Sequence, residues 1–297
     1  MIKIISLPAL LWVIFSSVSA NEFPPVPGQR HDIGGYQLHI HCLGTGSPTI
    51  IIDTGLGDDS SDWQSIVEQS SLTTQTCVYD RPGYGWSDYG PRPRDSERIA
   101  FELALLLQRA KIQPPYILVG HSFGGYNIRM FAASYPNKVA GLVLIDASHE
   151  NQYTQLNIKI PKNNRRIHSR ITQPRTNLNL ISTIQKNQLL RDKAFHTVRY
   201  EIYSLYQSSQ QVAHITSIPI VPLIVISRGI AEWFGNDKAR QREKTWIKLQ
   251  QDLTYLSPIS QHIFANRSGH NIHQQQPEII VDALSDVTHL ARLMSSP

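Results

Sequence analysis

The sequence predicts an α/β domain in which helices cover both faces of a mostly parallel sheet. Short apolar and β-branched runs alternate with helix-compatible segments from Thr49 to Asp146, the pattern of a parallel sheet with crossover helices. Polar residues stand at the ends of these runs, at Asp53, Asp80, Ser122 and Asp146. The carboxyl ends of parallel strands are where such folds place their sites. The length of 297 residues, with 41% hydrophobic and 17% charged residues, suits one well-cored domain.

The individual elements follow from local pattern. A hairpin is expected over Arg30–Cys42, where polar and apolar residues alternate around two glycines. The remaining strands are bounded by turn formers, and the helices by capping residues or prolines. Strands are expected over Thr49–Asp53, Thr76–Asp80, Tyr116–Val119, Val139–Ile145, Pro222–Ser227 and Gln261–Ala265, and helices through Trp63 and Ile66, over Ser96–Ala110, from the turn after Tyr116–Val119 to about Tyr135, and over Asn236–Asp252 and Pro277–Leu293.

The segment Gly120-His-Ser-Phe-Gly124 has the spacing of a sharp turn between a strand and a helix. Small residues on both sides of Ser122 allow the neighbouring chain to approach closely, so the turn can expose the serine hydroxyl. A serine hydroxyl becomes a useful nucleophile only with a base in hydrogen-bond reach and donors for the oxyanion. The amide of Phe123, at the start of the helix, is one such donor, and an amide in the glycine-rich turn at Leu56 is the expected second.

His270 is the best candidate for the base. It stands in a Ser-Gly-His turn directly after the last expected strand, where its side chain can reach the strand ends from outside the sheet. His121 is expected to pack within the turn of the nucleophile, and His149 and His273 are lesser candidates. His39 and His41 share one face of a strand, but no Cys or carboxylate cluster completes a metal shell around them, so we expect solvated residues and predict no metal site.

The region 150–215 differs in composition from the rest of the chain. Residues 151–191 contain eight Lys or Arg and no Asp or Glu, and the following stretch to residue 215 is more helical, with Tyr200, Tyr203 and Tyr206 on one face. We expect a helical insertion covering the strand ends, with the tyrosines in its core. Its positive charge, in a chain of net charge +5, is expected to be solvated. A second interpretation is that it attracts an anionic substrate or an acidic membrane surface.

The N-terminus has the pattern of a secretory signal peptide over residues 1–20. Lys3 precedes an apolar run from Leu7 to Phe15, and small residues end at Ala20. Residues 21–29 are a proline-rich extended leader, and the domain is expected over residues 30–297. Export, to the periplasm or the medium, permits disulfides, so the two cysteines, Cys42 and Cys77, are expected to be paired rather than free.

Four stretches together resemble the α/β-hydrolase superfamily, in particular its lidded serine esterases and its prolyl-aminopeptidase-like and haloperoxidase-like hydrolases. They are Asp53-Thr-Gly-Leu-Gly57, Asp80-Arg-Pro-Gly-Tyr-Gly-Trp-Ser87, Gly120-His-Ser-Phe-Gly-Gly125, and Gly269-His270 followed by Pro277-Glu278. The resemblance spans residues 30–293. It implies an eight-stranded α/β-hydrolase fold with a lid after the sixth strand, the chain order Ser122, acid, His270, and oxyanion donors at the amides of Leu56 and Phe123. It also implies that the strands of Cys42 and Cys77 are neighbours.

The acid departs from the family pattern. Most members carry it after the penultimate strand, where this chain offers only Glu232 in Ser227-Arg-Gly-Ile-Ala-Glu232. Some relatives carry it one strand earlier, where Asp146 stands. Asp146 is favoured because it follows a strong strand directly, and Glu232 is the alternative.

The predicted function is an exported serine hydrolase that cleaves a carboxylic ester or a related acyl compound through an acyl-enzyme. The serine excludes relatives that use an aspartate nucleophile, and no metal or organic cofactor is implied. A cofactor-free lyase or acyltransferase would keep the same residues. A noncatalytic binding protein would be expected to have lost one of them. The predicted partner is a small acyl substrate, anionic or membrane-bound if the basic insertion contacts it, and export argues against nucleic acid.

Overall fold

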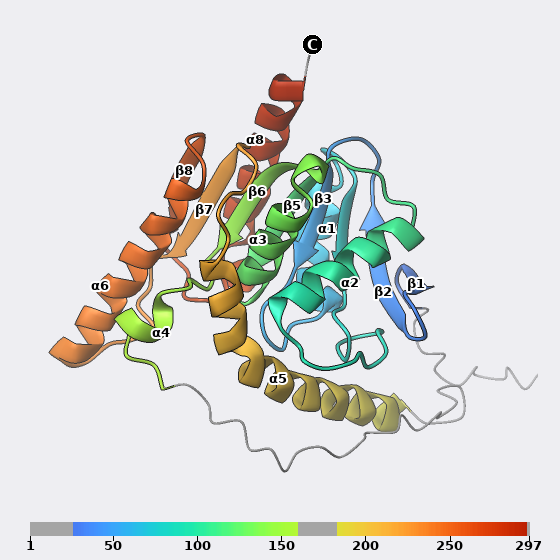
Figure 1. Cartoon of the computed structure of the whole chain (residues 1–297), viewed down its shortest axis with the longest axis horizontal. Helices are drawn as coiled ribbons and strands as arrows, with labels where there is room; N and C mark the ends of the chain where they lie inside the picture. Colours follow the sequence, from blue (N-terminus) through green and yellow to red (C-terminus); the bar gives the residue numbers. More distant parts are fainter. Residues whose placement is uncertain (1–25, 160–182, 296–297) are drawn as a thin grey trace, which may run out of the picture.

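The computed structural model describes residues 26–159 and 183–295. The predicted signal peptide and most of the basic segment therefore lie outside the described residues. The described part contains an eight-stranded sheet in the order β1-β2-β4-β3-β5-β6-β7-β8 (Figure 1). The strands are β1 (Gln29–Asp32), β2 (Gln37–Leu43), β3 (Thr49–Asp53), β4 (Thr76–Tyr79), β5 (Tyr116–His121), β6 (Val139–Ile145), β7 (Leu223–Arg228) and β8 (Ser260–Ala265). This is the α/β-hydrolase fold predicted from the sequence.

From β4 to β8 all neighbouring strands run parallel, and only the β1-β2 hairpin introduces antiparallel pairs. The longer helices are α1 (Gln64–Ser70), α2 (Ser96–Arg109), α3 (Gly124–Ser134), α5 (Thr183–Ala213), α6 (Asp237–Asp252) and α8 (Pro277–Ser295); short helices are η1 (Ser60–Trp63), η2 (Pro136–Lys138), α4 (Gln152–Gln155), η4 (Leu253–Leu256) and α7 (Ile272–Gln275). Helices α2 and α3 cover one face, and α1 and α8 the other (Figure 1).

The strand alternation explains how both faces become buried. In β3, Ile51 contributes to the core under α2 and α3, whereas Ile50 and Ile52 contribute to the core under α1 and α8. All three side chains are fully buried, as expected for a parallel strand with helices on both sides. This double core fixes the strand ends, and with them the turns that carry the candidate site.

The hairpin is joined to the sheet by a disulfide between Cys42 and Cys77. The two cysteines face each other directly in the antiparallel register of β2 and β4. The pairing expected from the sequence is therefore present. The prediction that His39 is a solvated strand residue is wrong, because its ring is fully buried. It contacts Asp80 through Nδ1 at 2.8 Å and the carbonyl of Pro27 through Nε2, and these two partners compensate the burial of the imidazole.

The helical insertion stands after the sixth strand, and its helix α5 lies across the ends of α2 and α3 (Figure 1). Its tyrosines do not form the buried face as predicted. Tyr206 is 37% exposed, and the ring of Tyr200 lies under the guanidinium of Arg92 at 3.5 Å. The buried positions are instead mostly small or polar: Thr197, Glu201, Ser204, Ser208, Ser209 and Val212.

A polar helix face can be buried because the domain supplies partners for it. Glu201 accepts hydrogen bonds from Arg81 Nε at 2.9 Å and from the hydroxyl of Tyr84 at 2.7 Å, and all three side chains are buried. The hydroxyl of Ser208 accepts a hydrogen bond from the amide of Ser96 at 3.0 Å. The described part of α5 is therefore fixed to the domain by a buried ion pair.

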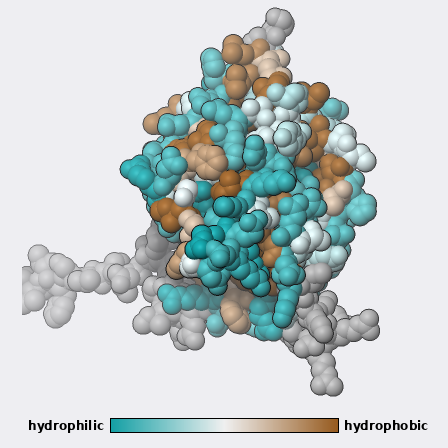
Figure 2. Space-filling model, turned by 90° about the vertical axis from the view of Figure 1, so that its left-hand side faces the viewer, coloured by the Kyte–Doolittle hydropathy of each residue, from teal (hydrophilic) through white to brown (hydrophobic). Residues whose placement is uncertain are grey.

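Among the described residues, no helix is both long enough and apolar enough to cross a membrane. On the side of the molecule that carries β8 and α6, hydrophobic residues lie in separate patches between hydrophilic ones (Figure 2).

Candidate active site

The turn between β5 and α3 holds Ser122 in a backbone conformation that is unusual for a residue with a side chain. Its φ is +52°, and its amide donates to the carbonyl of Ile145 at 3.1 Å. The turn is possible because glycines surround it: a Cβ on Gly124 would lie 2.1 Å from the carbonyl oxygen of Asp53, and one on Gly120 would lie 2.7 Å from Gly124. A strained, partly exposed serine at a strand-to-helix turn has the geometry of a nucleophile elbow.

His270 and Asp146 form a close pair at the same edge of the sheet. Nδ1 of His270 lies 2.6 Å from Oδ2 of Asp146, although the two residues are 124 positions apart. Asp146 is fully buried and has a φ of +38°, a second strained residue at this edge. The ring of His270 is 34% exposed and lies 4.8 Å, centroid to centroid, from the ring of His121, the residue before Ser122. The histidine therefore stands beside the serine turn with about a third of its side chain exposed.

Two further side chains hold the Asp146 carboxylate. Arg228 Nη1 donates to Oδ2 at 2.7 Å, and Trp246 Nε1 donates to Oδ1 at 2.7 Å. Arg228 is in turn held by a two-point ion pair with Glu243. Burial acts to raise the pKa of Asp146, but the hydrogen bond from His270 and the charge of Arg228 outweigh it and hold the pKa below its ordinary value. The carboxylate is therefore ionised and fixed in orientation at neutral pH.

Glu232, the alternative acid, has a different contact. Its Oε1 accepts a hydrogen bond from the backbone amide of His270 at 2.9 Å. It thus supports the turn that carries His270, whereas the ring nitrogen Nδ1 is paired with Asp146.

The two predicted oxyanion donors lie close to the serine turn. Phe123 follows Ser122 as the N-cap of α3, where a backbone amide points out of the helix end. Leu56 belongs to the turn after β3, and its side chain packs against the apolar cluster that contains Phe123. The contact between β3 and the start of α3 at Gly124 brings these two segments together.

A cluster of Asp58, His121 and His273 lies beside this turn. One ligand atom from each residue falls within 4.8 Å of the others, which is the arrangement that could hold a metal ion. His121 and His273 are buried, and the ring of His273 is stacked on Trp63 at 4.6 Å. Burial, with the neighbouring charge of His121, lowers the pKa of His273 to about 4, so its ring is neutral at neutral pH.

Other residues singled out in the sequence have structural partners. Asp53 accepts hydrogen bonds from Arg81 and Tyr79. Asp80 accepts one from His39, so neither carboxylate is available to His270. His149 is another predicted candidate base. Its Nδ1 accepts a hydrogen bond from the backbone amide of Asn151 at 3.0 Å.

Sequence reasoning missed the three residues around the acid: Arg228 and Trp246, which donate to Asp146, and Glu243, which holds Arg228. The only available signal was an arginine at the end of an apolar strand, Pro222–Ser227, where burial would require a carboxylate partner.

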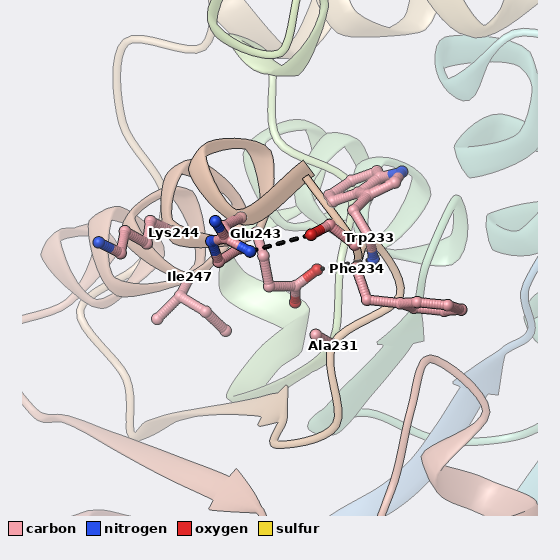
Figure 3. A pocket seen from close by; sticks show the side chains of 8 residues that line it. Ala231, Trp233, Phe234, Glu243, Lys244 and Ile247 are labelled. Atoms are coloured by element: carbon pink, nitrogen blue, oxygen red, sulfur yellow. Dashed lines mark hydrogen bonds between the residues drawn. The ribbon is translucent and has the colours of Figure 1, made fainter. Parts of the chain in front are cut away.

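A hollow of about 540 Å³ lies against the residues that hold Arg228 (Figure 3). Its walls come from the loop after β7 and from α6, and Trp233, Phe234 and Ile247 give it a largely apolar surface. Glu243 lines the hollow and also pairs with Arg228, whose guanidinium lies 5.0 Å from the ring centroid of Trp233 and 4.9 Å from that of Trp246. Glu243 and Arg228 therefore connect the wall of the hollow to Asp146.

Comparison with known proteins agrees with the geometry. The family model described as alpha/beta hydrolase fold matches residues 48–191. An uncharacterized protein of Bacillus subtilis, YqjL, is 26% identical over 272 residues, 91% of this chain and 95% of the relative. A putative lipase of Acinetobacter baumannii superimposes with a TM-score of 0.67 at 14% identity, covering 90% of this chain and 92% of the other. A thermophilic esterase of Thermogutta terrifontis gives a TM-score of 0.58 at 19% identity over 86% and 94% of the chains. The chain therefore has the α/β-hydrolase fold.

Proposed function

We propose that this hydrolase cleaves a carboxylic ester or a related acyl compound through a Ser122, His270, Asp146 triad. The observation that carries the proposal is the 2.6 Å contact between His270 Nδ1 and the buried carboxylate of Asp146, next to a serine held at positive φ. This contact holds the imidazole in the tautomer whose Nε2 is free to accept a proton. A histidine so oriented beside a partly exposed serine is the arrangement of an activated nucleophile.

The proposed reaction has two halves. Ser122 Oγ attacks the acyl carbon while His270 Nε2 accepts its proton, and the same nitrogen returns that proton to the leaving alcohol. The acyl group remains as an ester of Ser122. Water then attacks this ester with His270 again as base, which releases the acid and restores the serine. The amides of Leu56 and Phe123 are the proposed donors to the oxyanion in both halves, and no cofactor takes part.

The choice of ester chemistry is supported by the solved structures with the same fold, which include a putative lipase and an esterase. For the substrate we propose a small acyl compound. The basic composition of residues 151–191 favours one that is anionic or bound at a membrane surface. We further propose export after cleavage near Ala20. The disulfide supports this, because such bonds persist mainly in oxidising compartments.

The test is covalent labelling of the mature protein with a fluorophosphonate, followed by location of the adduct by mass spectrometry. Wild type is expected to carry one adduct, on Ser122, and to hydrolyse p-nitrophenyl acetate. Asp146→Asn is expected to label very slowly and Glu232→Gln at nearly the wild-type rate. An unlabelled wild-type protein, or an adduct on another serine, would overturn the proposal.

A further inference from the structure

The cluster of Asp58, His121 and His273 has unpartnered polar atoms although it is buried. Oδ2 of Asp58, Nδ1 of His121 and both ring nitrogens of His273 are buried and have no hydrogen-bond partner. Oδ2 of Asp58 lies 3.4 Å from His121 Nδ1 and 3.8 Å from His273 Nε2. Buried polar groups almost always have partners, so three side chains whose polar atoms converge without one indicate a missing partner of positive charge.

The tautomer of His121 sharpens this argument. Its Nε2 lies 3.0 Å from the backbone carbonyl of His270, and a carbonyl oxygen can only accept, so Nε2 carries a proton. Nδ1, the other ring nitrogen, faces the carboxylate oxygen of Asp58 at 3.4 Å. Two acceptors in that position repel each other unless a proton or a cation lies between them.

The distances favour a metal ion over a proton. A charge-assisted N–H···O bond would bring nitrogen and oxygen to roughly 2.7–2.9 Å, shorter than the 3.4 Å between His121 Nδ1 and Asp58 Oδ2. A tetrahedral zinc ion with bonds of roughly 2.0–2.2 Å separates its ligand atoms by about 3.4 Å. The separations of 3.4 and 3.8 Å to Asp58 Oδ2 are close to that value, and all three ligand atoms lie within 4.8 Å of one another.

We propose that Asp58 Oδ2, His121 Nδ1 and His273 Nε2 form a zinc-binding site, distinct from the catalytic triad. Two imidazoles and one carboxylate are a donor set that zinc accepts readily, and the fourth position is left for water. The hydrogen bond from His121 Nε2 to the carbonyl of His270 is the type of outer bond that metal-ligating histidines make. Asp58 is partly exposed, which gives an ion a path to the site.

The position of the site suits a structural role. Asp58 lies two residues after the proposed oxyanion donor Leu56, His121 directly precedes Ser122, and His273 lies three residues after His270. A zinc ion would join the three turns that carry the catalytic groups while contacting none of the reacting atoms. Zinc binding is therefore expected to stabilise the fold.

The experiment uses untagged, mature wild-type protein, dialysed against a chelator and titrated with zinc in competition with a chromophoric chelator. We expect one zinc ion per chain and a melting temperature that rises with zinc concentration. His273→Gln and Asp58→Asn are expected to weaken zinc binding by ~100-fold or more, because each removes one of three protein ligands. His289→Gln, an exposed histidine of α8, is the matched control and should bind as wild type does.

Two further measurements keep the outcome clear. X-ray absorption of the zinc-loaded wild type should show a nitrogen and oxygen shell at roughly 2.0–2.1 Å with imidazole scattering, a result that does not require any variant to fold. Ser122→Ala should bind zinc unchanged, so failure of the proposed hydrolase function would leave this test intact. Wild type that binds no zinc at 100 µM, or ligand variants that bind as tightly as wild type, would overturn the site and leave a protonated His121 paired with Asp58.

Discussion

Replacing Asp146 by Asn tests the proposed catalytic carboxylate, because it removes the charge and leaves the other residues of the site in place. The carboxylate accepts from His270 at 2.6 Å, Arg228 at 2.7 Å and Trp246 at 2.7 Å. An asparagine oxygen can still accept from Trp246, but its amide group then faces Nδ1 of His270. The imidazole would have to place its proton on Nε2 to accept from that amide. Nε2 could then no longer take the proton of the serine, so the substitution is expected to remove the base.

The expected loss is large for activity and moderate for stability. Holding a triad histidine in the wrong tautomer lowers kcat by roughly 10⁴-fold, which corresponds to about 5.5 kcal/mol of activation free energy. Removing one partner of a buried ion pair costs about 3–5 kcal/mol of unfolding free energy. Arg228 keeps its two-point pair with Glu243, so the lower end, about 3 kcal/mol, is expected here. The variant should therefore still fold at 20 °C.

The assay is hydrolysis of p-nitrophenyl acetate, measured as kcat/KM alongside a urea unfolding curve for each protein. Glu232→Gln is the matched control. Its side-chain oxygen can still accept the amide of His270, so a change of less than ~3-fold is expected. The reasoning would be refuted by a folded Asp146→Asn protein that keeps more than about a tenth of the activity, or by a ~10³-fold loss in Glu232→Gln.

Three other predictions concern stability. Replacing both Cys42 and Cys77 by Ala should lower the unfolding free energy by about 4 kcal/mol, the chain-entropy value for a loop closed across 35 positions, and reducing agent should then shift the urea midpoint of the wild type but not of the variant. Glu201→Gln leaves the buried guanidinium of Arg81 without one of its carboxylates, so a loss of about 3 kcal/mol of unfolding free energy is expected. Amide hydrogen exchange should become faster in α5 alone. Faster exchange throughout the domain would contradict a local role. Burial acts to raise the pKa of Glu150, but its ion pair with Arg129 lowers it to about 2. This depressed pKa gives stability that is complete above the unfolded pKa and lost as pH falls toward 2. The difference in unfolding free energy between wild type and Glu150→Gln should therefore shrink from about 3 kcal/mol at pH 6 to about 1 kcal/mol at pH 3. A difference that stays constant would reject the assignment.

The sheet and the serine turn were predictable from the sequence because their signals are local. A β-branched run such as Thr49–Asp53 has few alternatives to a buried strand, and Gly120 to Gly124 supplies the small residues that the turn requires. The same locality explains the correct expectation of a hairpin around two glycines. Each of these features is decided within about ten residues of sequence.

The buried polar partners were not predictable, because each joins segments that are far apart in the chain. His39 alternates with apolar residues as a surface strand residue does, and only the position of Asp80, 41 residues away, makes its burial possible. The buried face of α5 was misjudged for the same reason. A tyrosine stripe on a helix indicates a core when the helix packs against an apolar surface. Here the domain presents Arg81 and Ser96 to α5. The helix therefore buries Glu201 and small hydroxyl residues against them.

The partners of the strand-end carboxylates also explain why only one of them suits catalysis. Asp53 is held by Arg81, and Asp80 pairs with a histidine, His39, that is completely buried, so no substrate can reach either group. Asp146 likewise pairs with an arginine and a histidine, yet its histidine is one-third exposed and adjoins the serine turn. A buried histidine–aspartate pair is therefore not sufficient evidence of a catalytic site in this fold. What distinguishes the pair of His270 and Asp146 is a partly exposed imidazole beside the serine turn, which the proposed mechanism requires for proton exchange with Ser122.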